Sequence, residues 1–236
     1  FDENGQAMSS LAIFAYAQGN QVDVSSYKDP WEYGGDTGLK DQKVTIKKVK
    51  GMSESSIRGM DISSYLALKK AGVKYYDYEG NETPLLKVLH DNGINYIRIR
   101  IWNDPFNADG KTYGGGGNDV STGVEIAKEA AQYDMKVLLD FHYSDYWADP
   151  GQQNKPDAWK NLSFDELKEA VHKYTYDVLY RLKIMDCAPD MVQIGNEIRS
   201  GMLFPDGAVP QYRQLAALVN EGIRAVRELL PETKVM

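Results

Sequence analysis

The sequence predicts an α/β protein built on a parallel sheet, and three observations support this fold class. From Ser53 onward, strand-like runs alternate with helical ones. The strand-like runs are almost continuously apolar, which is typical of parallel strands buried on both faces. No G-x-G-x-x-G motif follows the first run, which weakens a dinucleotide-binding sheet. The doubly wound sheet and the eightfold barrel both stay open at this point.

Composition limits the classes of function. The chain has 236 residues, 42% of them hydrophobic, enough for one large domain or two modest ones. Its net charge of -7 argues against a nucleic-acid surface and favours a neutral or cationic partner. The single cysteine, Cys187, excludes an intrachain disulfide and is expected in the core. No apolar run reaches the ~18 residues of a membrane span.

Residues 1–52 differ from the remainder and are predicted to be β-rich. Short alternating stretches such as Val44–Ile46 are separated by Gly, Asp and Pro. The apolar run Leu11–Ala17 follows acidic residues, so we expect a strand and not a signal peptide. Because the chain opens at Phe1 without Met, we expect a mature product or a fragment.

The elements that follow can be assigned in order. Residues 56–65 form the first strand-like run, and residues 84–93 form a helix that Pro84 begins and Gly93 ends. Further strands are expected at 94–102, 136–143 and 190–197, with the start of a fifth at 234–236. The remaining helices span 121–134, capped by Ser121 or Thr122, 163–186, opened by a Ser163–Glu166 capping box, and 210–231. The glycine-rich 113–119 lacks the Lys and Ser/Thr of a phosphate loop and is predicted to be a flexible loop.

Two arginines share one face of the second strand. Side chains alternate in a strand, so Arg98, Arg100 and Trp102 face one way, and the intervening isoleucines face the other. Buried arginines need anionic partners. They serve either a functional site or a structural ion pair with Asp61 or Asp140.

The third strand ends in a polar and aromatic run. Asp140, His142 and Ser144 share a face, and Asp145, Tyr146 and Trp147 follow. A histidine of this kind is either a satisfied structural residue or part of a site at the carboxyl end of the sheet. Aromatic side chains in such loops suit the apolar faces of sugar rings.

The fourth strand finishes on Gly195, Asn196 and Glu197, where the apolar run stops. A glutamate at this position can act as a general acid/base when enclosure and a second carboxylate raise its pKa. A structural alternative is that Glu197 caps the next helix or pairs with an arginine. Glycine and asparagine are poor strand residues, which favours the functional interpretation.

Four motifs in this order, "RGMDISS", "YIRIRIWNDPFN", "DFHYSDYWADP" and "QIGNE", resemble glycoside hydrolase family 53, the endo-β-1,4-galactanases. The resemblance covers residues 53–236. It implies a (β/α)8 TIM barrel, of which the first four βα units and the start of strand five are present. It also implies retaining endo-hydrolysis of β-1,4-galactosidic bonds in type I arabinogalactan and pectic galactan, by an enzyme that is secreted or cell-surface and monomeric.

The same resemblance implies roles for individual residues. Glu197 would be the acid/base, and Asn196 would bind the sugar 2-hydroxyl beside the cleaved bond. Arg98 would position the nucleophile. The remaining cleft residues would be Asp61, Arg100, Trp102, His142, Asp145 and Trp147.

One departure from the family pattern is that the nucleophile is missing. In this family it is a second glutamate on strand seven, and residues 1–236 reach only the start of strand five. A retaining mechanism needs two carboxyl groups about 5 Å apart. Residues 1–236 alone are therefore expected to be inactive and self-associating. The family calcium site, where present, lies in the same later half, so no metal or cofactor is assigned to this chain.

Two interpretations of the function stay open beside the galactanase. The chain is a galactan-binding protein without catalysis, or another retaining barrel glycosidase that acts on mannan, xylan or cellulose. Residues 1–52 are either the end of a carbohydrate-binding β-sandwich or a leader packed on the barrel.

Overall fold

The computed structural model describes residues 49–53 and 55–236. The chain divides into two compact units, Phe1–Ser56 and Ile57–Met236, and the fold below is that of the second. The strands predicted at Leu11–Ala17 and Val44–Ile46 lie outside the described residues.

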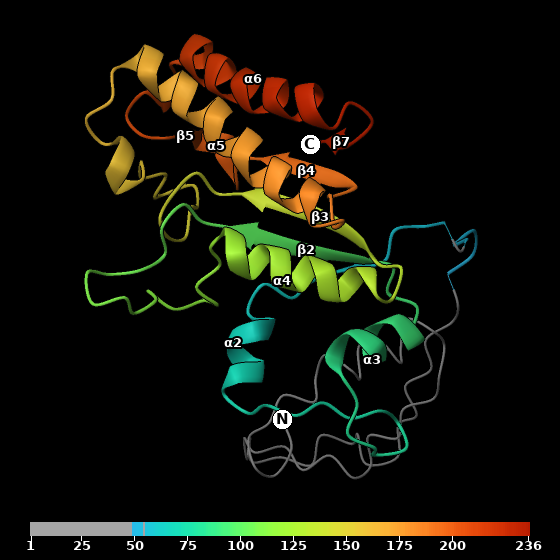
Figure 1. Ribbon diagram of the computed structural model, residues 1–236. Coiled ribbons are helices and arrows are strands. Elements are labelled where there is room, and N and C mark those ends of the chain that lie inside the picture. Colours follow the sequence, from blue (N-terminus) through green and yellow to red (C-terminus); the bar gives the residue numbers. More distant parts are fainter. Residues whose placement is uncertain (1–48, 54) are drawn as a thin grey trace, which may run out of the picture. The chain divides into compact units, whose positions relative to one another are not determined.

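A five-stranded parallel sheet forms the centre of this unit (Figure 1). Its strands lie side by side in the order in which they occur along the chain. A doubly wound sheet reverses its strand order at a switch point, whereas a barrel keeps chain order. The sheet is therefore wound as in an α/β barrel. Its strands are β1 (Gly59–Asp61), β2 (Tyr96–Ile101), β3 (Lys136–Phe141), β4 (Met191–Ile194) and β7 (Lys234–Val235).

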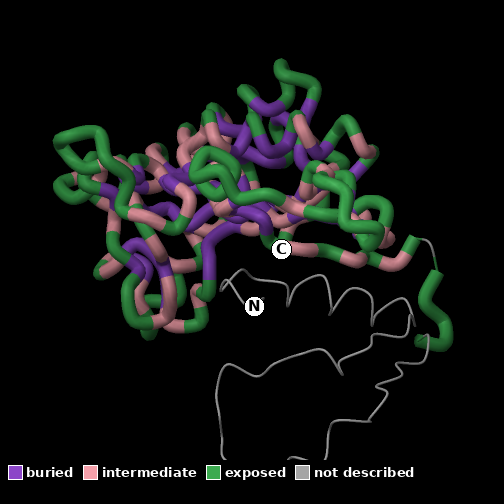
Figure 2. Tube along the Cα trace, turned by 90° about the horizontal axis from the view of Figure 1, so that it is seen from below, coloured by how far each residue is buried: buried purple, intermediate pink, exposed green. Residues whose placement is uncertain are grey.

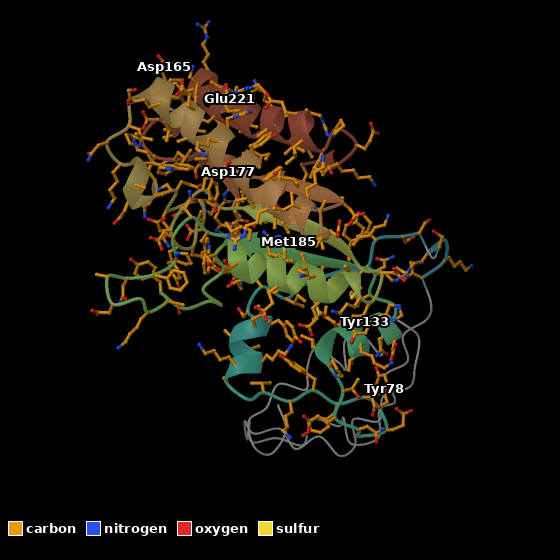
Figure 3. The ribbon with its side chains drawn as sticks, viewed as in Figure 1. Tyr78, Tyr133, Asp165, Asp177, Met185 and Glu221 are labelled. Atoms are coloured by element: carbon orange, nitrogen blue, oxygen red, sulfur yellow. The ribbon has the colours of Figure 1, made fainter. Side chains whose placement is uncertain are left out.

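Helices connect consecutive strands. Right-handed crossovers in a sheet of sequential order place all connecting helices on one face, and Figure 1 shows α4, α5 and α6 together on one side of the strands. In Figure 3, Asp165, Asp177 and Met185 mark α5 from its first turn to its end, and Glu221 lies on the neighbouring α6. The connecting helices are α3 (Leu85–Asp91), α4 (Val120–Ala131), α5 (Phe164–Ile184) and α6 (Tyr212–Leu229).

The core lies between the sheet and these helices. Ile97, Ile99 and Ile101 of β2 are completely buried, and the buried segments in Figure 2 run through the strands and the adjoining helices. Gly222 of α6 allows close approach, because a Cβ there would lie 2.7 Å from Cγ2 of Ile194. The alternation predicted for β2 is confirmed on this face.

The helix ends follow sequence signals with one exception. The Ser163–Glu166 capping box is present, Pro84 precedes α3, and Gly93 has a left-handed φ of 81° after it. The predicted Ser121 or Thr122 cap of α4 is wrong. The helix begins one residue earlier, and the Asp119 carboxylate accepts the backbone N–H of Thr122, the third helical residue.

Several short elements differ from the prediction. Only Gly59–Asp61 of the run 56–65 is a strand, and Tyr65 already begins a short helix, α2 (Tyr65–Lys70). An antiparallel pair, β5 (Gly201–Met202) and β6 (Gly207–Ala208), follows β4, with the single-turn helices η1 (Asp157–Trp159) and η2 (Ile198–Ser200) in the loops. Within the described part of the chain, no helix is both long and apolar enough to cross a membrane.

Candidate active site

Arg98 is the centre of a hydrogen-bonded network that joins four strands. Its Nη1 donates to Asp61 Oδ2 at 2.7 Å, and its Nη2 donates to Asp140 Oδ2 at 2.5 Å. The same Nη2 reaches Asn196 Oδ1, beyond the end of β4, at 2.9 Å. Arg98 therefore lies on the face of β2 opposite the isoleucines, as predicted. The ion pairs of Arg98 with Asp61 and Asp140 both exist. The structural interpretation of Arg98 as an ion-pair partner is therefore compatible with a role of the same side chain in the site.

Asp61 is held in its charged form at the end of β1. Burial raises its pKa, but hydrogen bonds from the Ser63 hydroxyl and amide, the charge of Arg100 and the hydrogen bond from Arg98 outweigh this and lower the pKa below its usual value. Asp61 is thus an anion that fixes one end of the Arg98 guanidinium.

His142 and Asp140 form a buried pair behind this network. The Ala148 N–H donates to His142 Nδ1 at 3.0 Å, which leaves Nε2 as the protonated nitrogen of a neutral ring. Nε2 lies 3.1 Å from Asp140 Oδ2. Neither side chain has any exposed surface. The expectation that His142 lines the cleft is therefore corrected: the ring supports Asp140 and the Ala148 loop from below.

Arg100 and Trp147 form a stacked pair at the surface. The Arg100 guanidinium carbon lies 4.3 Å from the Trp147 ring centroid, a cation–π distance. Burial lowers the pKa of Arg100, the Asp61 charge partly offsets this, and Arg100 Nη2 donates to Gly115 O at 3.3 Å. Trp147 stays half-buried. This pair offers a planar surface to a ligand.

Trp102 lies beneath that surface. It is completely buried, with ring centroids of His142, Tyr146 and Trp147 within 5.9 Å of its own. Its predicted position in the cleft wall is therefore corrected to a core position that supports Tyr146 and Trp147. Tyr146 is 39% exposed, so the ring accessible to a ligand on this side belongs to the loop and not to the strand end.

Asp145 connects two loops at the carboxyl end of the sheet. Its carboxylate accepts the N–H groups of Asp104, at 3.0 Å, and Asp157, at 2.8 Å. Burial raises the pKa of Asp145, those two hydrogen bonds oppose the shift, and the charges of Asp157 and Asp104 add to it. The side chain borders a hollow of about 410 Å³ between these loops, and its role as a substrate-binding residue stays a prediction.

The turn after β4 explains why the strand ends before Gly195. Gly195 has a φ of 87°, and a Cβ there would lie 2.6 Å from Cγ2 of Ile198. Glu197 is also left-handed, with φ 51° and ψ 41°. For a residue with a Cβ this conformation costs on the order of 1–2 kcal/mol. The strand therefore ends sharply at Ile194, three residues before the residue that carries the carboxylate.

Glu197 presents an unpaired carboxylate. Its residue is exposed, its side chain caps no helix, and no residue in the described part of the chain gives the carboxylate a hydrogen bond or ion pair. Both structural alternatives, a cap and an arginine pair, are thus wrong for the described residues. A free carboxylate at the carboxyl end of a barrel-type sheet is positioned for proton transfer to a ligand.

Asn196 is fixed immediately beside it. Its Oδ1 accepts from Arg98, and its Nδ2 donates to Ala148 O at 2.7 Å. One Nδ2 hydrogen has no further use in these contacts, so it can meet a ligand hydroxyl. The 94% buried Asn196 thereby couples the arginine network to Glu197.

Sequence reasoning missed the loop residues that enclose this end of the sheet. Gln153 is 98% buried and donates through Nε2 to the backbone oxygen of Asn196 at 2.7 Å. Lys155 pairs with Asp206 at 2.7 Å, and Phe204 borders the same hollow as Asp145. No periodic pattern of apolar residues marks such positions, because loops have no regular repeat. The only sequence signal for this loop was the pair of adjacent polar residues Gln152 and Gln153. Among residues 49–53 and 55–236, no cluster of His, Cys, Asp and Glu is arranged to hold a metal.

Comparisons with known proteins agree with this geometry. The family model described as Glycosyl hydrolase family 53 matches residues 57–236. The chain is 43% identical over 190 residues to the endo-beta-1,4-galactanase of Bacillus subtilis (strain 168), a match that covers 80% of this chain and 43% of the relative. It is 36% identical over 181 residues to the arabinogalactan endo-beta-1,4-galactanase of Thermothelomyces thermophilus, with 76% and 52% covered.

Solved structures give the same result. The Ignisphaera aggregans GH53 catalytic domain superposes with a TM-score of 0.78 at 45% identity, covering 79% of this chain and 52% of that one. A structure of fungal beta-1,4-galactanases superposes with a TM-score of 0.70 at 36% identity, covering 77% and 52%. The chain thus spans about half the length of the relatives it matches. The family match over residues 57–236 shows that the chain belongs to glycosyl hydrolase family 53.

Proposed function

We propose that this chain supplies the acid/base half of a retaining endo-β-1,4-galactanase acting on type I arabinogalactan and pectic galactan. The observation that carries the proposal is the exposed, unpaired Glu197 carboxylate at the end of β4. The names of the family relatives support the substrate, and the net charge of -7 is compatible with a neutral polysaccharide.

In the proposed reaction, Glu197 protonates the leaving glycosidic oxygen and then removes a proton from the attacking water. Asn196 donates its unused Nδ2 hydrogen to the 2-hydroxyl of the sugar in the subsite next to the cleaved bond. Trp147, stacked on Arg100, and Tyr146 offer apolar surface to neighbouring sugar rings. No cofactor or metal enters these steps.

The second carboxylate is proposed to come from outside the described residues. Asp140 has no exposed surface, and Asp61 is bonded to Ser63 and Arg98, so neither has the freedom of a nucleophile. Arg98, with its Asp61 contact, is placed to orient a carboxylate approaching from another strand. The complete protein is proposed to close a (β/α)8 barrel, to act as a monomer and to work outside the cell or on its surface, where its polysaccharide is found.

The test is Glu197→Gln in the full-length protein. The amide keeps the size of the side chain but cannot give or take the proton. We expect hydrolysis of β-1,4-galactan to fall at least ~100-fold, a typical general acid contribution, with galactan binding and melting temperature unchanged. Retention of turnover would remove Glu197 from the mechanism. A protein that binds galactan and never releases reducing sugar would instead be the non-catalytic binding protein.

Two controls test the substrate specificity and the need for the full-length protein. Mannan, xylan and cellulose assayed beside galactan separate the proposal from a barrel glycosidase of another specificity. Residues 1–236 expressed alone are expected to release no sugar, because neither Asp140 nor Asp61, the carboxylates bonded to Arg98, has the freedom of a nucleophile. Turnover by that polypeptide near the full-length rate would contradict the two-carboxylate mechanism.

A further inference from the structure

Two glutamine side chains hold the backbone on which Glu197 stands. Gln193 Nε2 donates to Gly195 O at 2.9 Å, and Gln153 Nε2 donates to Asn196 O at 2.7 Å. These are the two carbonyl groups that immediately precede Glu197. We call Gln153 and Gln193 the amide clamp.

The clamp replaces hydrogen bonds that the sheet no longer provides. Gly195 and Glu197 are both left-handed, so the strand pattern ends at Ile194. Gly195 and Asn196 are nevertheless buried, and a buried carbonyl without a partner is unfavourable. Side chains from β4 and from the loop after β3 therefore supply the donors.

The direction of the Glu197 carboxylate depends on these two peptide groups. A residue in a sparsely populated backbone conformation persists only where its surroundings determine it. The Asn196–Glu197 peptide carries the Asn196 carbonyl, so its rotation turns the Glu197 Cα–Cβ bond. Gln153 is the contact that opposes this rotation from the side of the loop.

The loop that carries Gln153 is itself attached to the same segment. Phe204 N donates to Gln153 O at 2.7 Å, and Ser200 Oγ donates to Pro150 O at 2.6 Å. Asn196 Nδ2 adds a third contact to Ala148 O. Because these contacts do not use the Gln153 amide, its removal leaves the loop anchored and releases only the peptide before Glu197.

We propose that Gln153 is a positioning residue, which acts through the Asn196 carbonyl to aim Glu197 for proton transfer, with Gln193 as its weaker partner. This inference rests on the proposed acid/base role of Glu197. It extends that role to a residue that makes no contact with the reacting bond.

Leaving-group chemistry tests the proposal in the full-length protein. The glycosidic oxygen of galactan is a poor leaving group that needs Glu197 as acid, whereas 2,4-dinitrophenolate leaves with little protonation. We expect Gln153→Met to lower kcat/KM for galactan roughly 10- to 100-fold, the range that a small misplacement of a catalytic group produces. The value for 2,4-dinitrophenyl β-galactobioside should stay within about twofold.

Gln152→Met is the matched control. Gln152 is adjacent and exposed, and its amide donates within its own turn to Asp149. It should retain both activities. Gln193→Met is the second variant if Gln153→Met fails to fold, with the same selective loss at smaller size.

Equal losses of Gln153→Met on both substrates, or no loss on galactan, would overturn the proposal, because a merely structural role has no dependence on the leaving group. Glu197→Gln on the same pair of substrates separates the two ideas. If Glu197→Gln lacks the leaving-group dependence, the proposed function fails. If it shows that dependence and Gln153→Met does not, only the positioning role fails.

Discussion

The two faces of β2 are built on opposite physical principles, although their residues alternate along six positions. On the helix side, Ile97, Ile99 and Ile101 are fully buried. Their hydrocarbon side chains can make only apolar contacts. On the other side, Arg98 and Arg100 contact carboxylates, a backbone carbonyl and an indole ring. The helix face gains stability from many weak contacts, whereas the polar face depends on one guanidinium that serves three partners.

This difference predicts that the polar face tolerates change far less well. Arg98→Met keeps the apolar stem and removes the charge, which leaves the fully buried Asp140 carboxylate without its cation. Breaking a buried ion pair on one side costs about 3–5 kcal/mol. We expect the free energy of unfolding of the full-length protein, measured by urea denaturation, to fall by that amount.

The double variant Arg98→Met/Asp140→Asn is the control for this prediction. It removes the uncompensated charge, so part of the loss should return. A cost for Arg98→Met no greater than that of a conservative change in the core would show that the network contributes little to the fold.

The adjacent residue tests the other face. Ile99→Val deletes one methyl group from a fully buried side chain, and such changes cost about 0.5–1.5 kcal/mol. The same urea experiment should report this smaller loss, with activity on galactan unchanged. A loss as large as that of Arg98→Met would mean that the two faces do not differ in the way described.

The smallest expected effect is a difference in pH dependence between two carboxylates. The pKa of Asp61 is lowered in the folded chain, so its contribution to stability is present above the usual value of 3.8 and is lost as pH falls. The pKa of Asp145 is raised, chiefly by burial, so its folded form favours the proton and loses stability as pH rises.

Thermal melts between about pH 3 and pH 6 check this prediction. The stability difference between wild type and Asp61→Asn should shrink toward acid pH. In the same direction, wild type should gain stability relative to Asp145→Asn. The stability difference between wild type and Ile99→Val should not change with pH. Slopes of the same sign for both aspartates would contradict the assignment of opposite shifts.

Much of the fold was accessible from the sequence because local signals and packing agree there. The alternation in "YIRIRIW" placed the arginines on one face, and the Ser163–Glu166 pair fixed the start of α5. The strand order was implied only by the family resemblance, since apolar runs by themselves do not state which strand lies beside which. The parallel pairing of β1, β2, β3, β4 and β7 shows it.

The candidate site residues were selected by their positions at strand ends, and such positions do not reveal exposure. Glu197 and Asn196 were selected for lying at a strand end, and the structure places them there beside Arg98. Trp102 and His142 were expected in the cleft but are buried, because a strand-end position does not reveal which loops fold over it. Gln153 was missed for the related reason that a loop contact with a backbone carbonyl leaves no sequence pattern.

The Arg98 network also bears on how the sheet assembles. Asp61 lies directly opposite Arg98 in the β1–β2 register, and Asp140 lies opposite Arg100 in the β2–β3 register. A slip of one residue in either pairing would turn these side chains to the apolar face. It would also leave a buried carboxylate without its cation. We therefore expect the guanidinium to discriminate during folding against misaligned strands, so that the residues that prepare the site also select the correct sheet.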